Sequence, residues 1–363
     1  METTSLYVHI PFCQTICSYC DFCKVYYDKK MASQYLEVLE KELKALKITQ
    51  PLKTVYIGGG TPSALSDEQL EYLMDLLKPY SQGCEEYCIE VNPESMDYYK
   101  LMILKQGGIN RLSIGVQTFQ DHLLKKIDRH HHSKQVERII LQAKKLGFDN
   151  ISIDLMYGLP DQTMTDIERD LDFVKELDIQ HISYYALILE DNTILKYQHY
   201  QPIDLEKEYQ INIYIDQKLK EQGFVKYEIS NYAKKEYESK HNLVYWHYEN
   251  YYGVGVGAAA KIDDCIIEHS RSLTKYLQQS DSNRISRQSL QDTMFNHVMM
   301  SLRLCAGLDL SDFKQRYHCD VREIYQKAID KNVAAGLLEI VDDHLKTTAP
   351  GMYVLNEILL DFM

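Results

Sequence analysis

The sequence has little of what a membrane-spanning, secreted or nucleic-acid-binding protein needs. No stretch approaches the ~18 consecutive apolar residues of a membrane span. The amino terminus lacks the basic segment and long apolar run of a secretory signal. The 40 Lys and Arg are outnumbered by 53 Asp and Glu, and no basic cluster is available to contact phosphates. We therefore expect a cytoplasmic protein that does not bind nucleic acid, while peripheral association with a membrane surface stays open.

Disulfide bonds are not expected either, although the chain contains nine cysteines. The cytosol keeps thiols reduced, so a tight cluster of cysteines indicates a metal site or catalysis first. The rest of the composition is that of an ordered globular protein, with 45% apolar and 26% charged residues among 363. A chain of this length can bury a core, and we expect one large and one small domain.

Short β-rich runs alternate with amphipathic helical patterns over roughly the first 190 residues. The β-rich runs are LYVHI at 6–10, TVYIGG at 54–59, YCIEV at 87–91, RLSIGV at 111–116, ISIDLMYG at 151–158 and HISYYALIL at 181–189. Repeated β/α units predict a parallel sheet, either an open doubly wound sheet or a full or partial barrel.

Glycine and polar residues gather at or near the carboxyl ends of these runs, at 58–61, 90–92, 117 and 154–157. In a β/α barrel this edge is the catalytic face. We therefore predict an α/β fold, a partial barrel of six β/α units. Residues 1–260 would form the barrel and a tyrosine-rich extension, and residues 261–363 a small, mainly helical domain ending in a short hairpin.

Three cysteines, Cys13, Cys17 and Cys20, are spaced C-x3-C-x2-C directly after the first predicted strand. Thiolates are the usual ligands of iron–sulfur clusters, and three of them can bind three irons of a cubane. The fourth iron then stays open for a small-molecule ligand. A structural zinc site and unrelated buried thiols are the alternatives.

The segment LYVHIPFCQTICSYCDF resembles the cluster-binding segment of radical S-adenosylmethionine (SAM) proteins, in the branch related to oxygen-independent coproporphyrinogen III oxidase. The resemblance implies a radical SAM barrel with a [4Fe-4S] cluster on Cys13, Cys17 and Cys20 and SAM on the open iron. In that superfamily an electron from the cluster cleaves SAM to methionine and a 5'-deoxyadenosyl radical. The protein orients SAM and excludes water.

The resemblance also implies which residues contact SAM. Glycines in GGGTP at 58–62 let backbone amides approach a ligand, and a Glu90 carboxylate suits a ribose diol. Without the resemblance, these would be a turn and a solvated carboxylate. The full set of expected contacts is Tyr7, Phe22, Gly58, Gly59, Gly60, Thr61, Glu90, Gln117, Arg129 and Asp154.

Two groups are left out of the predicted site. Cys23 departs from the family pattern, and as a fourth cluster ligand it would compete with SAM, so we interpret it as a spectator thiol. The three histidines at 130–132 are successive, so their side chains diverge, and we expect them to be mostly solvent-facing.

The motif HNLVYW at 241–246 matches HN-x-x-YW, which marks the heme-binding, chaperone-like branch of the same family. A histidine can ligate heme iron and aromatic faces can cover a porphyrin. The candidate heme-binding residues are His241, Asn242, Tyr245 and Trp246, with His241 as the candidate iron ligand. The alternative is a buried turn in which His241 and Asn242 satisfy backbone groups while the two aromatic residues pack.

Three functions follow. The first is a heme chaperone that binds heme, a [4Fe-4S] cluster and SAM and delivers heme to respiratory enzymes. A homodimer is compatible with this function. The second is a radical SAM oxidase that decarboxylates propionate side chains. It is disfavoured because the first predicted strand begins at Leu6, without the extension that precedes it in the oxidases. The third is a metal-stabilised binding module without radical chemistry.

Overall fold

The computed structural model describes residues 2–280 and 283–363, and its largest element is a nine-stranded sheet in the order β11-β1-β4-β5-β6-β7-β8-β10-β9. Six neighbouring strands in this order are parallel. They are β1 (Ser5–Ile10), β4 (Thr54–Gly59), β5 (Glu86–Val91), β6 (Arg111–Gln117), β7 (Asn150–Tyr157) and β8 (His181–Ala186). All six predicted runs are thereby confirmed as strands.

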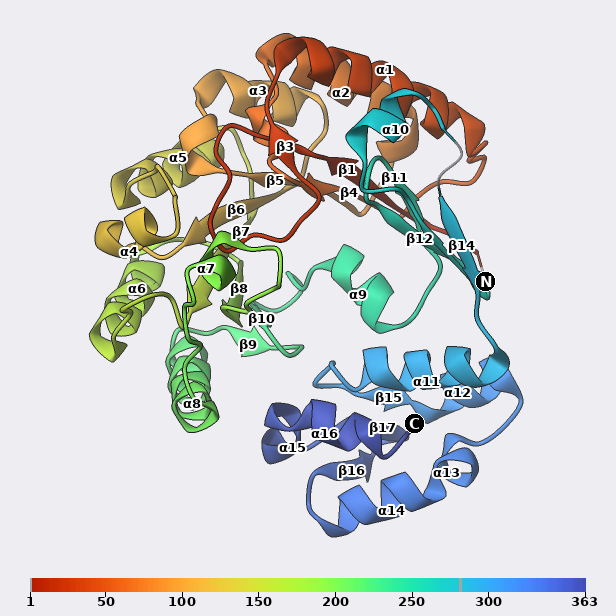
Figure 1. The fold of residues 1–363 in the computed structure, drawn as a ribbon. Helices are drawn as coiled ribbons and strands as arrows, with labels where there is room; N and C mark the ends of the chain where they lie inside the picture. The colour runs from red at the N-terminus through yellow and green to blue at the C-terminus, as the bar shows by residue number, and fades with distance from the viewer. Residues whose placement is uncertain (1, 281–282) are drawn as a thin grey trace.

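The sheet curves without closing, so the barrel is partial, as predicted. Its edge strands are β11 (Tyr252–Val254) and β9 (Val225–Lys226), the latter beside β10 (Asn231–Ala233). Helices cover the convex face, and Figure 1 shows them as an outer arc around the strands. These helices are α1 (Lys29–Ala45), α2 (Asp67–Ser81), α3 (Tyr98–Gln106), α4 (Asp121–Lys126), α5 (Ser133–Lys145), α6 (Met164–Glu176) and α8 (Leu205–Glu221).

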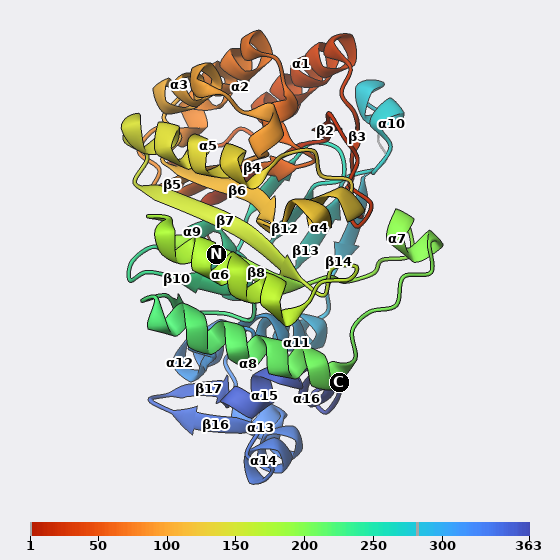
Figure 2. The same cartoon turned by 90° about the vertical axis from the view of Figure 1, so that its left-hand side faces the viewer.

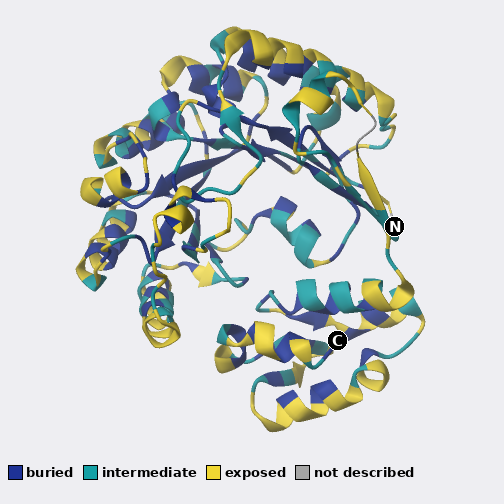
Figure 3. Cartoon of the chain, in the orientation of Figure 1, coloured by how far each residue is buried: buried dark blue, intermediate teal, exposed yellow. Residues whose placement is uncertain are grey.

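Alternation along the strands separates the core from a hollow lumen. In β6, Leu112, Ile114 and Val116 join the hydrophobic core beneath the helices, whereas residues 111, 113, 115 and 117 line a cavity. Figure 3 shows the buried strands inside the arc of helices whose outer faces are exposed. Because the inward residues are mostly small or polar, the lumen is left unfilled and can hold a ligand.

A second hydrophobic core lies in the carboxyl-terminal part of the chain, among residues from Met294 to Phe362. Residues 261–280 and 283–287 do not belong to it, because Leu273, Tyr276 and Leu277 pack against the barrel core. That segment contains β13 (Cys265–Glu268) and β14 (Arg284–Arg287), which form a three-stranded sheet with β12 (Ala259–Ile262) in the order β12-β13-β14. It also contains the short helix α10 (Leu273–Leu277). The predicted boundary after residue 260 is therefore corrected to about residue 288.

The carboxyl-terminal domain is mainly helical, as predicted, and lies below the barrel (Figure 2). The predicted hairpin is present as β16 (Leu338–Val341) and β17 (His344–Thr347), but two further helices follow it, so the chain does not end there. The helices of the domain are α11 (Leu290–Ser301), α12 (Leu310–Tyr317), α13 (Val321–Ile324), α14 (Gln326–Ala334), α15 (Ala349–Tyr353) and α16 (Leu355–Leu360), and β15 (Leu308–Asp309) pairs with β17.

The motif HNLVYW lies in a short helix, α9 (Lys240–Trp246), on the open side of the barrel. It contacts β4 on one side and α11 of the carboxyl-terminal domain on the other. Within the part of the chain that the structure describes, no helix has the length and apolarity to cross a membrane.

Candidate functional site

A cavity of about 270 Å³ joins the cysteine loop to the barrel lumen. Cys13, Cys17 and Cys20 line it together, although sequence spacing alone did not determine that their side chains would face the lumen. Most of the expected SAM contacts line the same cavity, namely Phe22, Gly59, Gly60, Thr61, Glu90, Gln117, Arg129 and Asp154. The geometry thus collects residues from the cysteine loop and four strand ends around one space.

The cysteine loop is closed by two short strands, β2 (Phe12–Cys13) and β3 (Val25–Tyr26), which pair in parallel. The Thr61 hydroxyl donates to Cys13 Sγ at 3.5 Å. Burial raises the pKa of the Cys13 thiol to about 11 and also raises that of Cys20. A metal bound there would have to displace these protons, as thiolate ligation always requires.

Gly60 lets two loops approach each other more closely than any side chain would allow. A Cβ atom at Gly60 would lie 2.7 Å from the Pro11 carbonyl carbon and 3.0 Å from Cys13 Sγ. Gly58 has a different role, because it does not line the cavity and a Cβ there would lie 2.8 Å from the Glu90 carboxyl carbon. Gly58 therefore makes room for Glu90 in this structure.

Two partly buried carboxyl groups face the cavity. Glu90 accepts hydrogen bonds from the Tyr56 hydroxyl and the Gly59 amide, both at 2.9 Å. Asp154 accepts from the Ser113 hydroxyl at 3.3 Å. Burial raises the pKa of Glu90 to about 7 and that of Asp154 to about 6. Such groups can accept hydrogen bonds from ligand hydroxyls without carrying two fixed charges into the cavity.

Arg129 is buried beside the cysteine loop, with Nη1 3.9 Å from Cys17 Sγ and Nη2 donating to the Gly115 carbonyl. Its anionic partner is Glu94, whose Oε2 lies 3.6 Å from Arg129 Nη2 and 3.2 Å from His131 Nδ1. Despite its burial, Glu94 has its pKa lowered to about 2, through hydrogen bonding to His131 and the Arg129 charge. The loop between α4 and α5 thus places a fixed cation at the cavity wall.

Sequence reasoning missed Glu94 and gave His131 the wrong environment. His130 and His132 are exposed, as expected, but His131 is only 1% exposed and its Nε2 lies 3.2 Å from the Val116 carbonyl oxygen. No signal within the run of three histidines distinguishes the middle one. Glu94 could have been noticed only as the last residue of IEVNPE, four positions after Glu90.

Tyr185 is a further cavity residue that the sequence did not single out, and Asn92, from the strand-end group at 90–92, lines the cavity as well. The Tyr185 hydroxyl donates to Gln117 Oε1 at 3.2 Å. Gln117 has φ +67°, and the register between β6 and β7 shifts between Gly115 and Gln117. A local bulge therefore turns the Gln117 side chain into the cavity.

Tyr7 and Cys23 lie outside the lining of the cavity. The Tyr7 hydroxyl is 3.0 Å from His9 Nδ1, and His9 Nε2 is 2.8 Å from the Cys23 carbonyl oxygen. Tyr7 thus acts on the cysteine loop through His9, and it does not reach the cavity wall in this structure. The Cys23 thiol donates to the Arg271 carbonyl at 3.4 Å, a contact that does not involve the other three thiols.

His241 is 0% exposed and both of its ring nitrogens have partners. Nδ1 lies 2.8 Å from the Thr54 hydroxyl and Nε2 lies 2.8 Å from the Tyr245 hydroxyl. The ring also stacks on Tyr56, and burial lowers its pKa to about 3. Both ring nitrogens of His241 are therefore engaged in this structure, within a helix rather than a turn, and ligation of heme iron by His241 stays a prediction.

The other motif residues point in different directions. Asn242 lines the cavity, while Tyr245 lines a separate space of about 140 Å³ against α11. The Trp246 ring lies 5.8 Å from the Arg303 guanidinium, and its carbonyl accepts from the Ser301 hydroxyl at 3.1 Å. The four residues do not form one heme-sized surface; they connect the cavity to the carboxyl-terminal domain.

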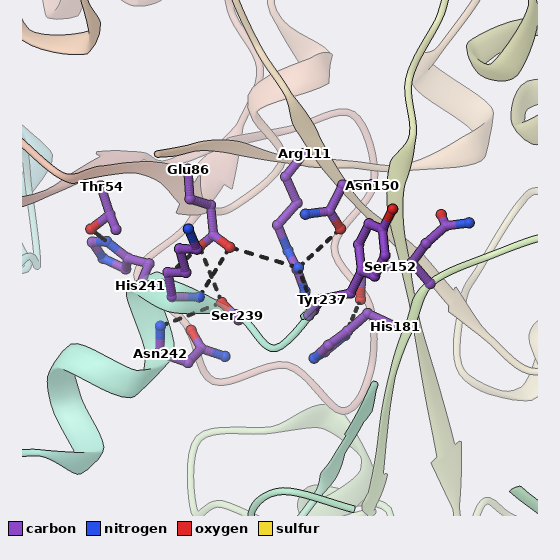
Figure 4. Close-up of polar contacts among 12 residues, drawn as sticks. Thr54, Glu86, Arg111, Asn150, Ser152, His181, Tyr237, Ser239, His241 and Asn242 are labelled. Carbon is purple, nitrogen blue, oxygen red and sulfur yellow. Dashed lines mark hydrogen bonds and ion pairs between the residues drawn. The ribbon is translucent and has the colours of Figure 1, made fainter. Parts of the chain in front are cut away.

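Figure 4 shows how the amino terminus of α9 is fixed at the floor of the cavity. The Glu86 carboxylate accepts hydrogen bonds from the backbone amides of Lys240 at 3.0 Å and His241 at 2.9 Å. A carboxylate at this position also complements the positive end of the helix. Arg111 Nη1 lies 3.7 Å from Glu86 and donates to the Asn150 side chain at 3.0 Å.

The residues around the cavity fit a cubane cluster. Three thiols, the small Gly60 and the Arg129 cation surround one space, and the remaining cysteine of the loop, Cys23, is outside it. In a cubane each thiolate binds a different iron, so the thiols need not converge on one point. Among the described residues, no three His, Cys, Asp or Glu side chains converge on a position for a single ion.

Comparisons with known proteins agree with this arrangement. The sequence pattern of the Radical SAM superfamily matches residues 7–174, and that of the HemN C-terminal domain matches residues 288–354, directly after β14. Among solved structures, coproporphyrinogen III oxidase (HemN) from Escherichia coli, a radical SAM enzyme, superimposes with a TM-score of 0.86. It is 26% identical, and the match covers 99% of this chain and 90% of that one.

Three further proteins match over nearly their whole length, and each is named heme chaperone HemW. The protein from Bacillus subtilis (strain 168) is 37% identical over 99% of both chains. That from Lactococcus lactis (strain IL1403) is 34% identical over 100% of this chain and 98% of its own. That from Escherichia coli (strain K12) is 31% identical over 99% of this chain and 98% of its own.

Proposed function

The chain belongs to the radical SAM family of heme chaperones named HemW, and from that membership we propose that it binds heme and passes it to a heme-accepting enzyme. The proposed acceptors are respiratory enzymes. The observation that carries the proposal is the match to HemW proteins over both domains, at higher identity than the match to the oxidase. A homodimer is compatible with this function and stays a prediction.

The proposed cofactors are a [4Fe-4S] cluster on Cys13, Cys17 and Cys20, with SAM beside it. When bound, the cluster would supply one electron. The chain's own residues would orient SAM: Glu90 accepts from the ribose hydroxyls, and Arg129 attracts the carboxylate. Asn92 and Gln117 supply amide groups to the same cavity wall.

A second candidate is oxygen-independent coproporphyrinogen III oxidase activity. It is favoured by one observation, the superposition on the oxidase over 99% of this chain. The chemistry would be abstraction of a hydrogen atom from a propionate side chain, followed by loss of carbon dioxide and transfer of one electron to an external one-electron acceptor, which leaves a vinyl group. The chaperone proposal ranks first because it uses the same fold and also accounts for the matches to HemW.

The test is an anaerobic heme titration of the cluster-reconstituted protein, followed by the Soret band, with a parallel assay for coproporphyrinogen turnover. We expect saturable binding near one heme per chain and no protoporphyrinogen product. Heme retention no greater than that of a nonspecific control protein would overturn the chaperone proposal. Turnover by the same preparation would establish the oxidase in its place.

A further inference from the structure

A strap of chain, residues 187–204, leads from the carboxyl end of β8 to the start of α8 and passes beside the cysteine loop. It contains one short helix, α7 (Ile194–Tyr197), whose amino terminus is capped by the Thr193 hydroxyl. Figure 1 shows α7 next to the cysteine loop, and Figure 2 shows the strap projecting past the carboxyl ends of the barrel strands. The strap adds no strand to the sheet, so other contacts must hold it in place.

A small hydrophobic cluster, separate from the main barrel core, holds the strap. Its buried members are Leu123, Ile127, Met156, Leu159, Leu187 and Leu195. Leu195 is the buried residue of α7, at 2% exposure, whereas its neighbour Ile194 is 43% exposed. Burial of one leucine side chain contributes about 2 kcal/mol, so Leu195 is a main attachment point of a strap this short.

The same cluster reaches the cysteine loop through the two residues between its second and third cysteines. The Leu195 amide donates to the Ser18 carbonyl at 3.0 Å, and the Ser18 amide donates to the Ile127 carbonyl at 3.3 Å. Tyr19 packs against the cluster and also lines the cavity. This part of the loop is therefore fixed by the strap on one side and by the end of α4 on the other.

Two further hydrogen bonds fasten the strap near its two ends. The Leu187 amide donates to the Tyr157 carbonyl, and the Tyr200 hydroxyl donates to the Gly158 carbonyl, each at 2.8 Å. Both acceptors lie where β7 ends, so the strap bridges this strand end and the cysteine loop. A site that is held in shape before its ligand binds loses less conformational freedom on binding.

We propose that Leu195 is a positioning residue for the cluster, and that the strap holds Cys17 and Cys20 in the arrangement that binds iron. This role rests on the proposed cluster site and extends it to a segment outside the cavity. Leu195 does not line the cavity, so it acts through its contacts with Ser18 and Tyr19. When the strap is loosened, the two thiols gain freedom and become more accessible to reagents in solution.

The experiment compares Leu195→Ala with Leu195→Met and Ile194→Ala in the full-length protein. Leu195→Met conserves the side-chain volume and should restore wild-type behaviour. Ile194→Ala is the matched control, because it removes an exposed side chain from the same helix. The first measurement, on the apoprotein, is the rate at which iodoacetamide alkylates Cys17 and Cys20, followed by mass spectrometry. Leu195→Ala should raise both rates about tenfold through local opening of the strap, and leave that of Cys319 in the carboxyl-terminal domain unchanged.

The second measurement, on the cluster-reconstituted protein, is the rate at which excess EDTA removes iron under anaerobic conditions. Leu195→Ala should lose iron about tenfold faster than the wild type, because thiols with more freedom release iron more readily. Urea denaturation of the same variants shows whether the barrel stays folded. If Leu195→Ala unfolds it, Tyr200→Phe takes its place, since it removes only the hydroxyl contact near the other end of the strap. It should raise both rates by a smaller factor.

The outcomes separate the role of the strap from the proposed cluster. If the wild type assembles a cluster and a folded Leu195→Ala matches it in both rates, the positioning role is overturned and the cluster stands. Equal effects of Ile194→Ala and Leu195→Ala would also overturn it, because the buried side chain would then have no special part. If the wild type assembles no cluster, the proposed cofactor fails, and the alkylation rates still decide whether the strap holds the loop.

Discussion

The Tyr245 hydroxyl lies 2.8 Å from His241 Nε2, so two residues of the HNLVYW motif satisfy each other inside one turn of α9. Thr54 occupies the other ring nitrogen from strand β4. The motif histidine therefore fastens α9 to the barrel, and α9 in turn forms the floor of the cavity. The motif thus connects the cavity structurally to the carboxyl-terminal domain.

This connection predicts a large loss of stability in His241→Ala. The substitution removes two buried hydrogen bonds and leaves the Thr54 and Tyr245 hydroxyls without their His241 partner beside a new cavity. We expect His241→Ala to lower the free energy of unfolding by about 3 kcal/mol. Tyr245→Phe, which removes one of these hydrogen bonds, should lower it by about 1 kcal/mol. Urea denaturation measures both. The control is His247→Ala at an exposed histidine, which should lower the free energy of unfolding by at most about 0.5 kcal/mol. Equal losses in His241→Ala and His247→Ala would contradict a structural role that is specific to His241.

The cysteine loop predicts selective loss of iron. Cys13→Ala, Cys17→Ala or Cys20→Ala should each prevent assembly of a stable cubane, because each thiol binds a separate iron. Cys23→Ala should retain the cluster, since its thiol faces Arg271. Iron and sulfide content after anaerobic reconstitution gives the answer, with Cys319→Ala in the carboxyl-terminal domain as a control. Loss of the cluster in Cys23→Ala would show that the fourth thiol is a ligand.

The ion pair between Glu94 and Arg129 should affect how tightly the protein binds SAM. Glu94→Gln keeps the shape of the side chain but removes the anion that faces Arg129 and His131. We expect SAM to bind about tenfold more weakly, because Arg129 is no longer held beside Cys17, equivalent to ~1.4 kcal/mol. Isothermal titration with SAM measures the change. The control is Glu68→Gln, which alters an exposed ion pair with Lys29 and should bind SAM with the affinity of the wild type. Wild-type SAM affinity in Glu94→Gln would show that the ion pair with Arg129 plays no part in SAM binding.

Glu228 predicts a pH-dependent stability that is independent of the cluster. It is 0% exposed where the barrel meets Leu304, and burial raises its pKa from 4.5 to about 7. A carboxyl group that holds its proton more tightly when folded stabilises the fold fully below pH 4.5. That contribution, about 3 kcal/mol at most, is lost as the pH rises through 7.

Glu228→Gln removes this titration, so its stability relative to the wild type should rise between pH 4.5 and pH 8. Denaturation curves of the apoprotein at each pH measure the difference. Asp361→Asn serves as the control, because hydrogen bonds from Lys331 and Asn332 lower the pKa of this partly exposed carboxyl and keep it ionised over this range. If the curves for Glu228→Gln and the wild type stay parallel over this range, Glu228 does not titrate as described.

The barrel could be predicted because local patterns and tertiary structure agree there. The residues of β6 alternate between Leu112, Ile114 and Val116 on the core side and small or polar residues on the lumen side, and both sets are visible in the sequence. Ser66 likewise caps α2 through a reciprocal pair of hydrogen bonds with Gln69. The cavity residues were predictable because strand ends meet at one edge of a parallel sheet.

What could not be predicted depends on partners far apart in the sequence. The partner of His241 is Thr54, 187 positions away. The domain boundary was placed too early because α10 packs on the barrel through Tyr276, whose hydroxyl donates to Glu42 at 2.5 Å. Neither contact leaves a periodic signal, and a buried His131 reads the same as its exposed neighbours until the fold is known.

In the proposed function, one cavity holds both the cluster and SAM. The most direct test is electron paramagnetic resonance of the reduced, reconstituted protein with and without SAM. We expect about four irons per chain and a cluster signal that shifts when SAM is added, with the shift lost in Arg129→Ala. A cluster whose signal is unchanged by saturating SAM would contradict it.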